Sequence, residues 1–142
     1  MSDSTDVRAG GCLCGKLRYT AWGTPLWVAH CHCRSCQRTS GAPFVTYAGY
    51  LEDRFAITSG SPASFASSPG VIRRFCADCG TPVIYQATRW PGEVHVCVCT
   101  FDAPATLAPQ AHVYVAESQP WVRLADGLPR FAKTSKEGSP LP

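Results

Sequence analysis

Seven of the nine cysteines in this 142-residue chain lie in three short stretches, and their spacing is typical of metal ligands. Thiolates are soft ligands that suit zinc, and two cysteines one or two residues apart can reach one ion from a tight turn. Because nine is an odd number, disulfide bonds cannot pair every cysteine, and the clustering favours metal binding over a disulfide framework. The stretches contain Cys12 and Cys14; Cys31, Cys33 and Cys36; and Cys76 and Cys79.

The first and last of these stretches predict one closed zinc site. Each contributes two thiolates, and the four ligands Cys12, Cys14, Cys76 and Cys79 complete a tetrahedron. One ion shared by the two pairs closes a loop of about sixty residues, so much of its binding free energy becomes folding free energy. We therefore expect loss of any one of these four cysteines to unfold the protein.

The middle stretch predicts a second, open zinc site. Cys31, Cys33 and Cys36 offer three thiolates within six residues, which leaves the fourth position of a tetrahedral ion for water or substrate. A closed site indicates a structural role, whereas an open one indicates chemistry. An alternative is a redox pair at Cys33 and Cys36, although the βαβ pattern of thioredoxin-like proteins is not evident.

Two histidine positions leave alternatives open. His32 could be a fourth ligand or a general base, but on an extended strand it points away from Cys31 and Cys33, which favours a bond to a neighbouring backbone group. His95, Cys97 and Cys99 share one face of a β-prone run and could form a third metal site. The preferred interpretation is that both cysteines are small buried apolar groups.

The elements that must position these residues are mostly short strands. Twelve prolines and twelve glycines favour strands joined by tight turns over long helices, so we predict an all-β class with short helical turns. In residues 16–22 the alternation predicts that Leu17, Tyr19 and Ala21 face inward. We expect one domain over residues 11–131, a loose N-terminus at 1–10 and a flexible tail at 132–142. The expected strands are 16–22, 26–33, 44–48, 54–58, 71–75, 93–101 and 112–115, with a helical turn at 37–40.

Composition narrows the possible partners. No apolar run approaches the ~18 residues of a membrane span, and the polar, acidic start is unlike a secretory signal, so we expect a cytoplasmic, reduced protein. The formal net charge is +3. Zinc with four thiolates carries a charge of −2 and zinc with three carries −1, so the protein with both ions bound is neutral. A neutral protein has no overall charge to attract nucleic acid, so we do not expect nucleic-acid binding. The sequence leaves the oligomeric state open.

The chain resembles the glutathione-dependent formaldehyde-activating enzyme family, which includes the centromere protein V type. The resemblance implies an Mss4-like fold of several coiled antiparallel sheets, with a structural zinc at the two outer cysteine pairs and a second zinc at the triplet. It also implies the joining of glutathione to formaldehyde, formally a carbon–sulfur lyase reaction. Cys97 and Cys99 depart from the family pattern, which more often has small or aliphatic residues at these two positions. The motifs that carry the resemblance are residues 11–15, 31–37 with 40–44, and 75–82, followed by Asp102, Pro104, His112 and Pro120-Trp121.

The leading hypothesis is therefore an enzyme that adds a thiol to a small aldehyde at the triplet, with Cys31, Cys33 and Cys36 as the catalytic zinc ligands. The partners are then glutathione or a similar thiol, and formaldehyde or a similar aldehyde. Arg38, Thr39 and Ser40 are candidate partners for the developing oxyanion because they follow closely in sequence. The alternative is a zinc module without catalytic activity that binds a protein or a nucleic acid.

Overall fold

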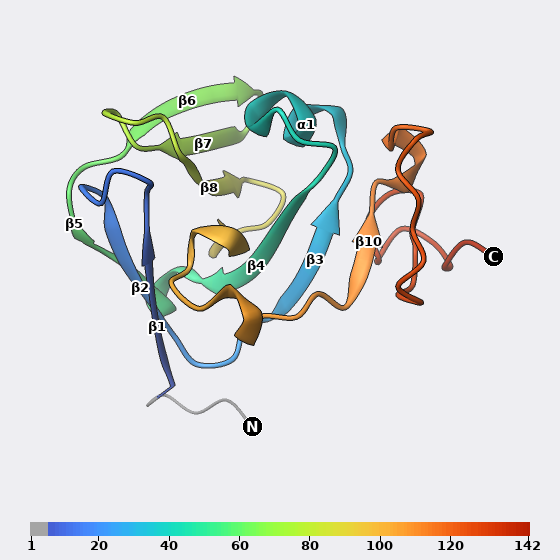
Figure 1. Cartoon of the computed structure of the whole chain (residues 1–142), viewed down its shortest axis with the longest axis horizontal. Coiled ribbons are helices and arrows are strands. Elements are labelled where there is room, and N and C mark those ends of the chain that lie inside the picture. The colour runs from blue at the N-terminus through green and yellow to red at the C-terminus, as the bar shows by residue number, and fades with distance from the viewer. Residues whose placement is uncertain (1–5) are drawn as a thin grey trace. The chain divides into compact units, whose positions relative to one another are not determined.

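The computed structural model describes residues 6–142, and within that range the chain is mainly β with a single α-helix (Figure 1). This confirms the predicted fold class. Two compact units share the chain. Of the described residues, the first comprises 6–26 together with Ala48–Leu107, and the second comprises Trp27–Tyr47 and Ala108–Pro142. The single domain expected over residues 11–131 stays a prediction.

A three-stranded antiparallel sheet in the first unit carries the predicted alternation. Its order is β1-β2-β5, and β2 lies in the middle. Leu17, Tyr19 and Ala21 are at most 2% exposed, as their inward positions required, because every second side chain of a strand points to the same face. The strands are β1 (Val7–Gly11), β2 (Arg18–Trp22) and β5 (Phe55–Ser59).

The first unit also contains a series of adjacent strands in the order β4-β9-β8-β7-β6. Val83 and Val96 are fully buried on this series, and Tyr50 is 1% exposed. The strand expected over residues 93–101 is shorter than predicted, because the backbone turns into a 3-10 helix at Val98–Thr100. The strands are β4 (Val45–Leu51, of which 48–51 belong to this unit), β9 (Glu93–Cys97), β8 (Pro82–Ala87), β7 (Val71–Phe75) and β6 (Ala63–Ser68). Further 3-10 helices are Glu52–Arg54 and Pro104–Thr106.

The second unit is organised around β3 (Trp27–Cys31), which lies between β10 (Ala111–Val113) and residues 45–47 of β4. β10 pairs with β3 in parallel, and this is visible in Figure 1 as two arrows with the same direction. The helix α1 (Arg34–Ser40) follows β3 directly and starts earlier than the expected turn at 37–40. It ends at Gly41, whose N–H donates to the Gln37 carbonyl. A 3-10 helix covers Val115–Glu117.

Loose segments were expected at the two chain ends, and the described residues there make backbone contacts. Residues 1–5 of the expected loose N-terminus lie outside the described residues, but Val7–Gly11 forms strand β1 and pairs with β2. The segment 132–142 contains no helix or strand, yet Thr134 is buried and the Leu141 N–H donates to the Arg130 carbonyl at 2.7 Å. The flexibility of this tail stays a prediction. Throughout residues 6–142, no helix has the length and apolar character needed to cross a membrane.

Candidate metal centres

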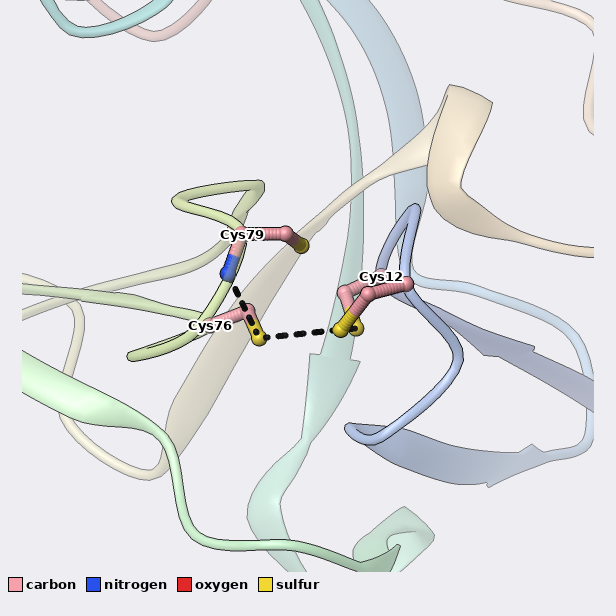
Figure 2. A group of neighbouring side chains, drawn as sticks. Cys12, Cys76 and Cys79 are labelled. Carbon is pink, nitrogen blue, oxygen red and sulfur yellow. Dashed lines mark hydrogen bonds between the residues drawn. The ribbon is translucent and has the colours of Figure 1, made fainter.

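The structure brings Cys12, Cys14, Cys76 and Cys79 together in the first unit, and we call this group the four-cysteine cluster. One sulfur atom from each lies within 4.8 Å of all the others. The Sγ atoms of Cys12 and Cys14 are 3.5 Å apart, and those of Cys14 and Cys76 are 3.7 Å apart. A tetrahedral zinc with Zn–S bonds of ~2.3 Å separates its sulfur ligands by about 3.8 Å. The donor set therefore fits one zinc ion, with Cys76 and Cys79 facing Cys12 across the cluster (Figure 2).

Two turns of the same construction position these sulfurs. In each, the first cysteine donates its N–H to the carbonyl five residues later and accepts at its own carbonyl from a glycine N–H. The glycines have φ angles of 82° and 78°, a conformation that costs other residues energy because of their Cβ atom. Two glycines thus let each turn bend tightly around its cysteines. The bonds are Cys12 N to Leu17 O (3.0 Å), Gly15 N to Cys12 O (3.1 Å), Cys76 N to Thr81 O (3.0 Å) and Gly80 N to Cys76 O (2.9 Å).

Donors around the four-cysteine cluster stabilise thiolate sulfur. The Leu17 N–H points at Cys12 Sγ at 3.3 Å, and the Cys79 N–H points at Cys76 Sγ at 3.5 Å (Figure 2). The Thr81 hydroxyl lies 3.2 Å from Cys79 Sγ. Hydrogen bonds from the side chain and the backbone of Thr81 lower the pKa of Cys79 to about 5. These contacts orient the sulfurs and prepare them for a cation.

Crowding of the thiols has the opposite effect on Cys14. A backbone hydrogen bond from Lys16 lowers its pKa, but the neighbouring thiols and burial outweigh this bond and raise the pKa to about 12. Four negative sulfurs at these distances repel one another unless a positive ion lies between them. The chemistry of the cluster therefore also fits zinc, which binds the fully deprotonated set.

Cys31, Cys33 and Cys36 form the three-cysteine cluster in the second unit. Their sulfur atoms lie within 4.8 Å of one another, with Cys33 Sγ 3.0 Å and Cys31 Sγ 3.5 Å from Cys36 Sγ. These separations are far longer than the ~2.05 Å of a disulfide, and all three cysteines are free thiols. Three soft donors around one point can hold a zinc ion and leave a fourth ligand position.

The end of β3 and the start of α1 hold this cluster in place. Cys33 is the N-cap residue of α1, and its sulfur accepts the Cys36 N–H at 3.3 Å. Cys36 is only 2% exposed, and its sulfur lies 3.6 Å from the hydroxyl of the buried Tyr47. Hydrogen bonds to Cys33 and Cys36 raise the pKa of the Cys31 thiol, so this group also needs a cation to lose all three protons.

Of the three predicted oxyanion partners, Ser40 has its hydroxyl engaged elsewhere. The Ser40 hydroxyl donates to the Cys36 carbonyl at 2.7 Å and accepts the Ala42 N–H at 3.1 Å, which ties it to the end of the helix. Arg38 and Thr39 are exposed. The structure places the hydroxyl of Tyr47 against the cluster, and the position of this residue on the strand after the helix gave no signal in the sequence.

His32 is bonded to a second histidine, which neither sequence interpretation anticipated. Its Nε2 lies 2.9 Å from Nδ1 of His112, and Nε2 of His112 lies 2.7 Å from Oδ2 of Asp126. Both rings are almost completely buried. Burial, then the charge of His112, lowers the pKa of His32 to about 4, so this imidazole is neutral at pH 7. The sequence carried no signal for the contacts of His32, His112 and Asp126, because His112 is remote from His32 along the polypeptide.

The possible third metal site at His95, Cys97 and Cys99 is not formed. Among residues 6–142, the groupings with metal-like geometry do not include any of these three. Cys97 is buried, as expected, whereas Cys99 is exposed because the backbone leaves β9 and turns at Val98–Thr100. His95 contacts Glu93 instead, with Nε2 2.9 Å from a carboxylate oxygen.

The fold and the site geometry define a mainly β protein with two clusters of cysteine thiols that can hold zinc. The family model for the glutathione-dependent formaldehyde-activating enzyme matches residues 7–117, which is most of the chain. The chain therefore belongs to that family. A crystal structure of a Rhodobacter sphaeroides protein is similar, with a TM-score of 0.54 and 18% identity over 66% of this chain and 87% of that one. This likeness supports the fold.

Proposed function

We propose that the protein is an enzyme that adds a thiol, glutathione or a similar one, to a small aldehyde such as formaldehyde. The product with these substrates is S-hydroxymethylglutathione, which places the enzyme among the carbon–sulfur lyases. The observation that carries the proposal is the three-cysteine cluster, which offers one ligand fewer than a tetrahedral zinc requires. Membership of the formaldehyde-activating family supports this choice of substrates.

The chemistry requires a thiolate nucleophile close to an aldehyde. Zinc held by Cys31, Cys33 and Cys36 would supply positive charge that favours the thiolate form of a bound thiol. The substrate sulfur then forms a bond to the aldehyde carbon, the C=O π electrons move to oxygen, and the oxygen takes up the proton that the thiol lost. The chain's contribution is to fix the cluster: Cys33 caps α1, and Tyr47 lies against Cys36.

The four-cysteine cluster has a different proposed role, which is to hold the fold. Its two turns are 62 residues apart at Cys14 and Cys76, and an ion bound to both would close that loop. Four thiolates complete the tetrahedron and leave no position for substrate. The cytoplasmic location expected for such free thiols stays a prediction.

The test is Cys33→Ser. Serine is a favoured N-cap residue, so the substitution keeps the cap of α1 while it removes one soft ligand. We expect the variant to fold, to keep the zinc of the four-cysteine cluster, and to lose thiol-dependent consumption of formaldehyde. Cys99→Ser, which changes an exposed thiol outside both clusters, is the matched control and should keep full activity. Unchanged turnover in Cys33→Ser would contradict the proposal.

A second measurement addresses the binding of the thiol itself. Zinc per chain is determined by elemental analysis on reduced protein, with and without added glutathione. Two zinc ions, one of which becomes labile or changes its sulfur coordination with glutathione, are the expected result. One tightly held zinc that ignores glutathione would instead favour the alternative of a zinc module that binds a macromolecule.

A further inference from the structure

A third group of ligand-type side chains lies in the second unit, apart from the cysteines. His30, His112 and Asp126 each offer a nitrogen or oxygen atom, and these atoms lie within 4.8 Å of one another. His30 and His112 have their ring centroids 4.7 Å apart, and Oδ2 of Asp126 lies 2.7 Å from Nε2 of His112. Two imidazoles and one carboxylate form a donor set that suits first-row transition metals.

The pairing of β10 with β3 explains why the two histidines meet. The strands are parallel, and His112 is the register partner of His30, so the two side chains emerge next to each other. The chain then returns to the other side of β10, where the His112 N–H donates to Pro129 and the Phe131 N–H donates to the His112 carbonyl, both at 2.8 Å. This return places Asp126 beside the histidine pair.

Each of the three side chains is also held by a hydrogen-bond contact outside the group. Nδ1 of His30 lies 2.8 Å from the Thr46 hydroxyl, and Nδ1 of His112 lies 2.9 Å from Nε2 of His32. Oδ1 of Asp126 accepts the Leu128 N–H at 3.1 Å, which orients Oδ2 toward His112. Metal-binding histidines are typically fixed in this way through their other ring nitrogen.

The electrostatics of the group also suit a cation. The hydrogen bond from His112, then that from the Leu128 N–H, lowers the pKa of Asp126, whose carboxylate is therefore ionised. One carboxylate would leave a bound divalent ion with one positive charge, and water can reach the group because Asp126 is 42% exposed.

We propose that His30, His112 and Asp126 form a third metal site, distinct from both thiol clusters, that binds a divalent transition ion such as zinc, cobalt or iron(II). The nitrogen donors select against calcium and magnesium, which prefer shells of oxygen ligands. The site does not depend on the proposed thiol addition, since no cysteine contributes to it. Its chemistry is that of a borderline metal with exchangeable water, whereas the cysteine clusters are soft sites.

The experiment measures Co²⁺ binding to the full chain loaded with only two equivalents of zinc, which the soft thiolates of the two clusters bind in preference to nitrogen and oxygen ligands. We expect calorimetry to show one further equivalent of Co²⁺. Its visible absorption should be weak, because nitrogen and oxygen ligands lack the intense charge-transfer bands of a cobalt–thiolate bond. No thiol or aldehyde substrate is present, so the result is independent of activity.

Asp126→Asn is the main variant, because asparagine keeps an oxygen that can accept from His112 but lacks the negative charge. We expect it to weaken Co²⁺ binding by about 100-fold or more, since loss of an outer partner alone costs about 10–100-fold. His30→Gln should weaken it similarly. Asp53→Asn, at an exposed carboxylate in the first unit, is the matched control and should bind as the unmodified chain does.

Three outcomes would overturn the proposal. The first is the absence of a third equivalent of Co²⁺, which would leave a hydrogen-bonded histidine pair without metal. The second is equal affinity in Asp126→Asn and Asp53→Asn. The third is intense thiolate charge-transfer absorption, which would show that cobalt had displaced zinc from a cysteine cluster.

Discussion

The four-cysteine and three-cysteine clusters use the same ligand atom at similar spacing, but their ligands come from very different distances along the chain. The first draws on two turns 62 residues apart, at Cys14 and Cys76. The second lies within residues 31–36, where β3 ends and α1 begins. An ion at the first site ties together remote segments, so its binding contributes to folding, whereas an ion at the second constrains only a local junction. Chain separation is therefore the basis on which we propose a structural role for the first cluster and a chemical role for the second.

The largest expected effect follows from breaking the four-cysteine cluster with Cys76→Ser. Structural zinc contributes about 10–16 kcal/mol of apparent binding free energy, which is comparable to the ~5–15 kcal/mol by which whole domains are stable. Cys76 is only 3% exposed, so the change also buries a hydroxyl beside the remaining thiols. We expect loss of cooperative thermal unfolding, as measured by circular dichroism, together with loss of zinc.

The matched control for this prediction is Cys99→Ser, because Cys99 is exposed and outside both clusters. Its thermal unfolding should not change. If Cys76→Ser still unfolded cooperatively with a midpoint near that of the control, the four-cysteine cluster would not be a structural site, and the comparison between the clusters would fail.

An intermediate effect is expected when zinc is removed in steps with a chelator. The three-cysteine site has one protein ligand fewer and an open position that a chelator can enter. Zinc per chain should therefore fall from two to one while the thermal midpoint stays the same, and the second ion should leave only as the protein unfolds. Elemental analysis paired with circular dichroism follows both events. Simultaneous loss of the two ions would show that the sites are equally stable.

A smaller effect concerns the buried His95 of the first unit. Burial lowers its pKa below the ordinary value of 6.5, although Glu93 acts in the opposite direction. As the pH falls below 6.5, His95 therefore takes up a proton in the unfolded chain before it does so in the folded chain. The free energy of unfolding is unaffected by this group above pH 6.5 and decreases as the pH falls toward the lowered pKa. One such group changes the unfolding free energy by at most about 1.4 kcal/mol per pH unit.

Urea unfolding of zinc-saturated protein between pH 5.5 and 8 measures this slope. The variant His95→Gln should show a flatter dependence, because glutamine does not titrate. The same slope in both proteins would mean that the imidazole of His95 titrates alike in the folded and unfolded chains.

Strands with a clear hydrophobic alternation were predictable, and strands that depend on their neighbours were not. Tyr19 and Ala21 alternate with polar residues, which is sufficient to predict β2. β1 contains two glycines and β6 consists mostly of alanine and serine, so their intrinsic preference for extended structure is low. Pairing with β2 and β7 stabilises them through backbone hydrogen bonds that leave no periodic pattern in the sequence.

The cysteine clusters show the same division. Ligand type and local spacing were sufficient to place Cys31, Cys33 and Cys36 in one group, because six residues cannot separate them far. The sequence could only suggest that the two outer pairs complete one another. The contact of Tyr47 with Cys36 was not predictable, because it depends on how the chain returns after α1.

By itself, the sequence determined the chemistry of the donors, the tight turns around them and the mainly β class, since all three follow from residues that are close along the chain. The tertiary structure decided which remote residues meet. His112 lies beside His30 only because β10 pairs with β3 in parallel at one particular register, and a shift by one residue would turn His112 to the opposite face. Asp126 reaches the pair because the chain folds back along β10. Such long-range pairings depend on the packing of the whole unit, which no local pattern encodes.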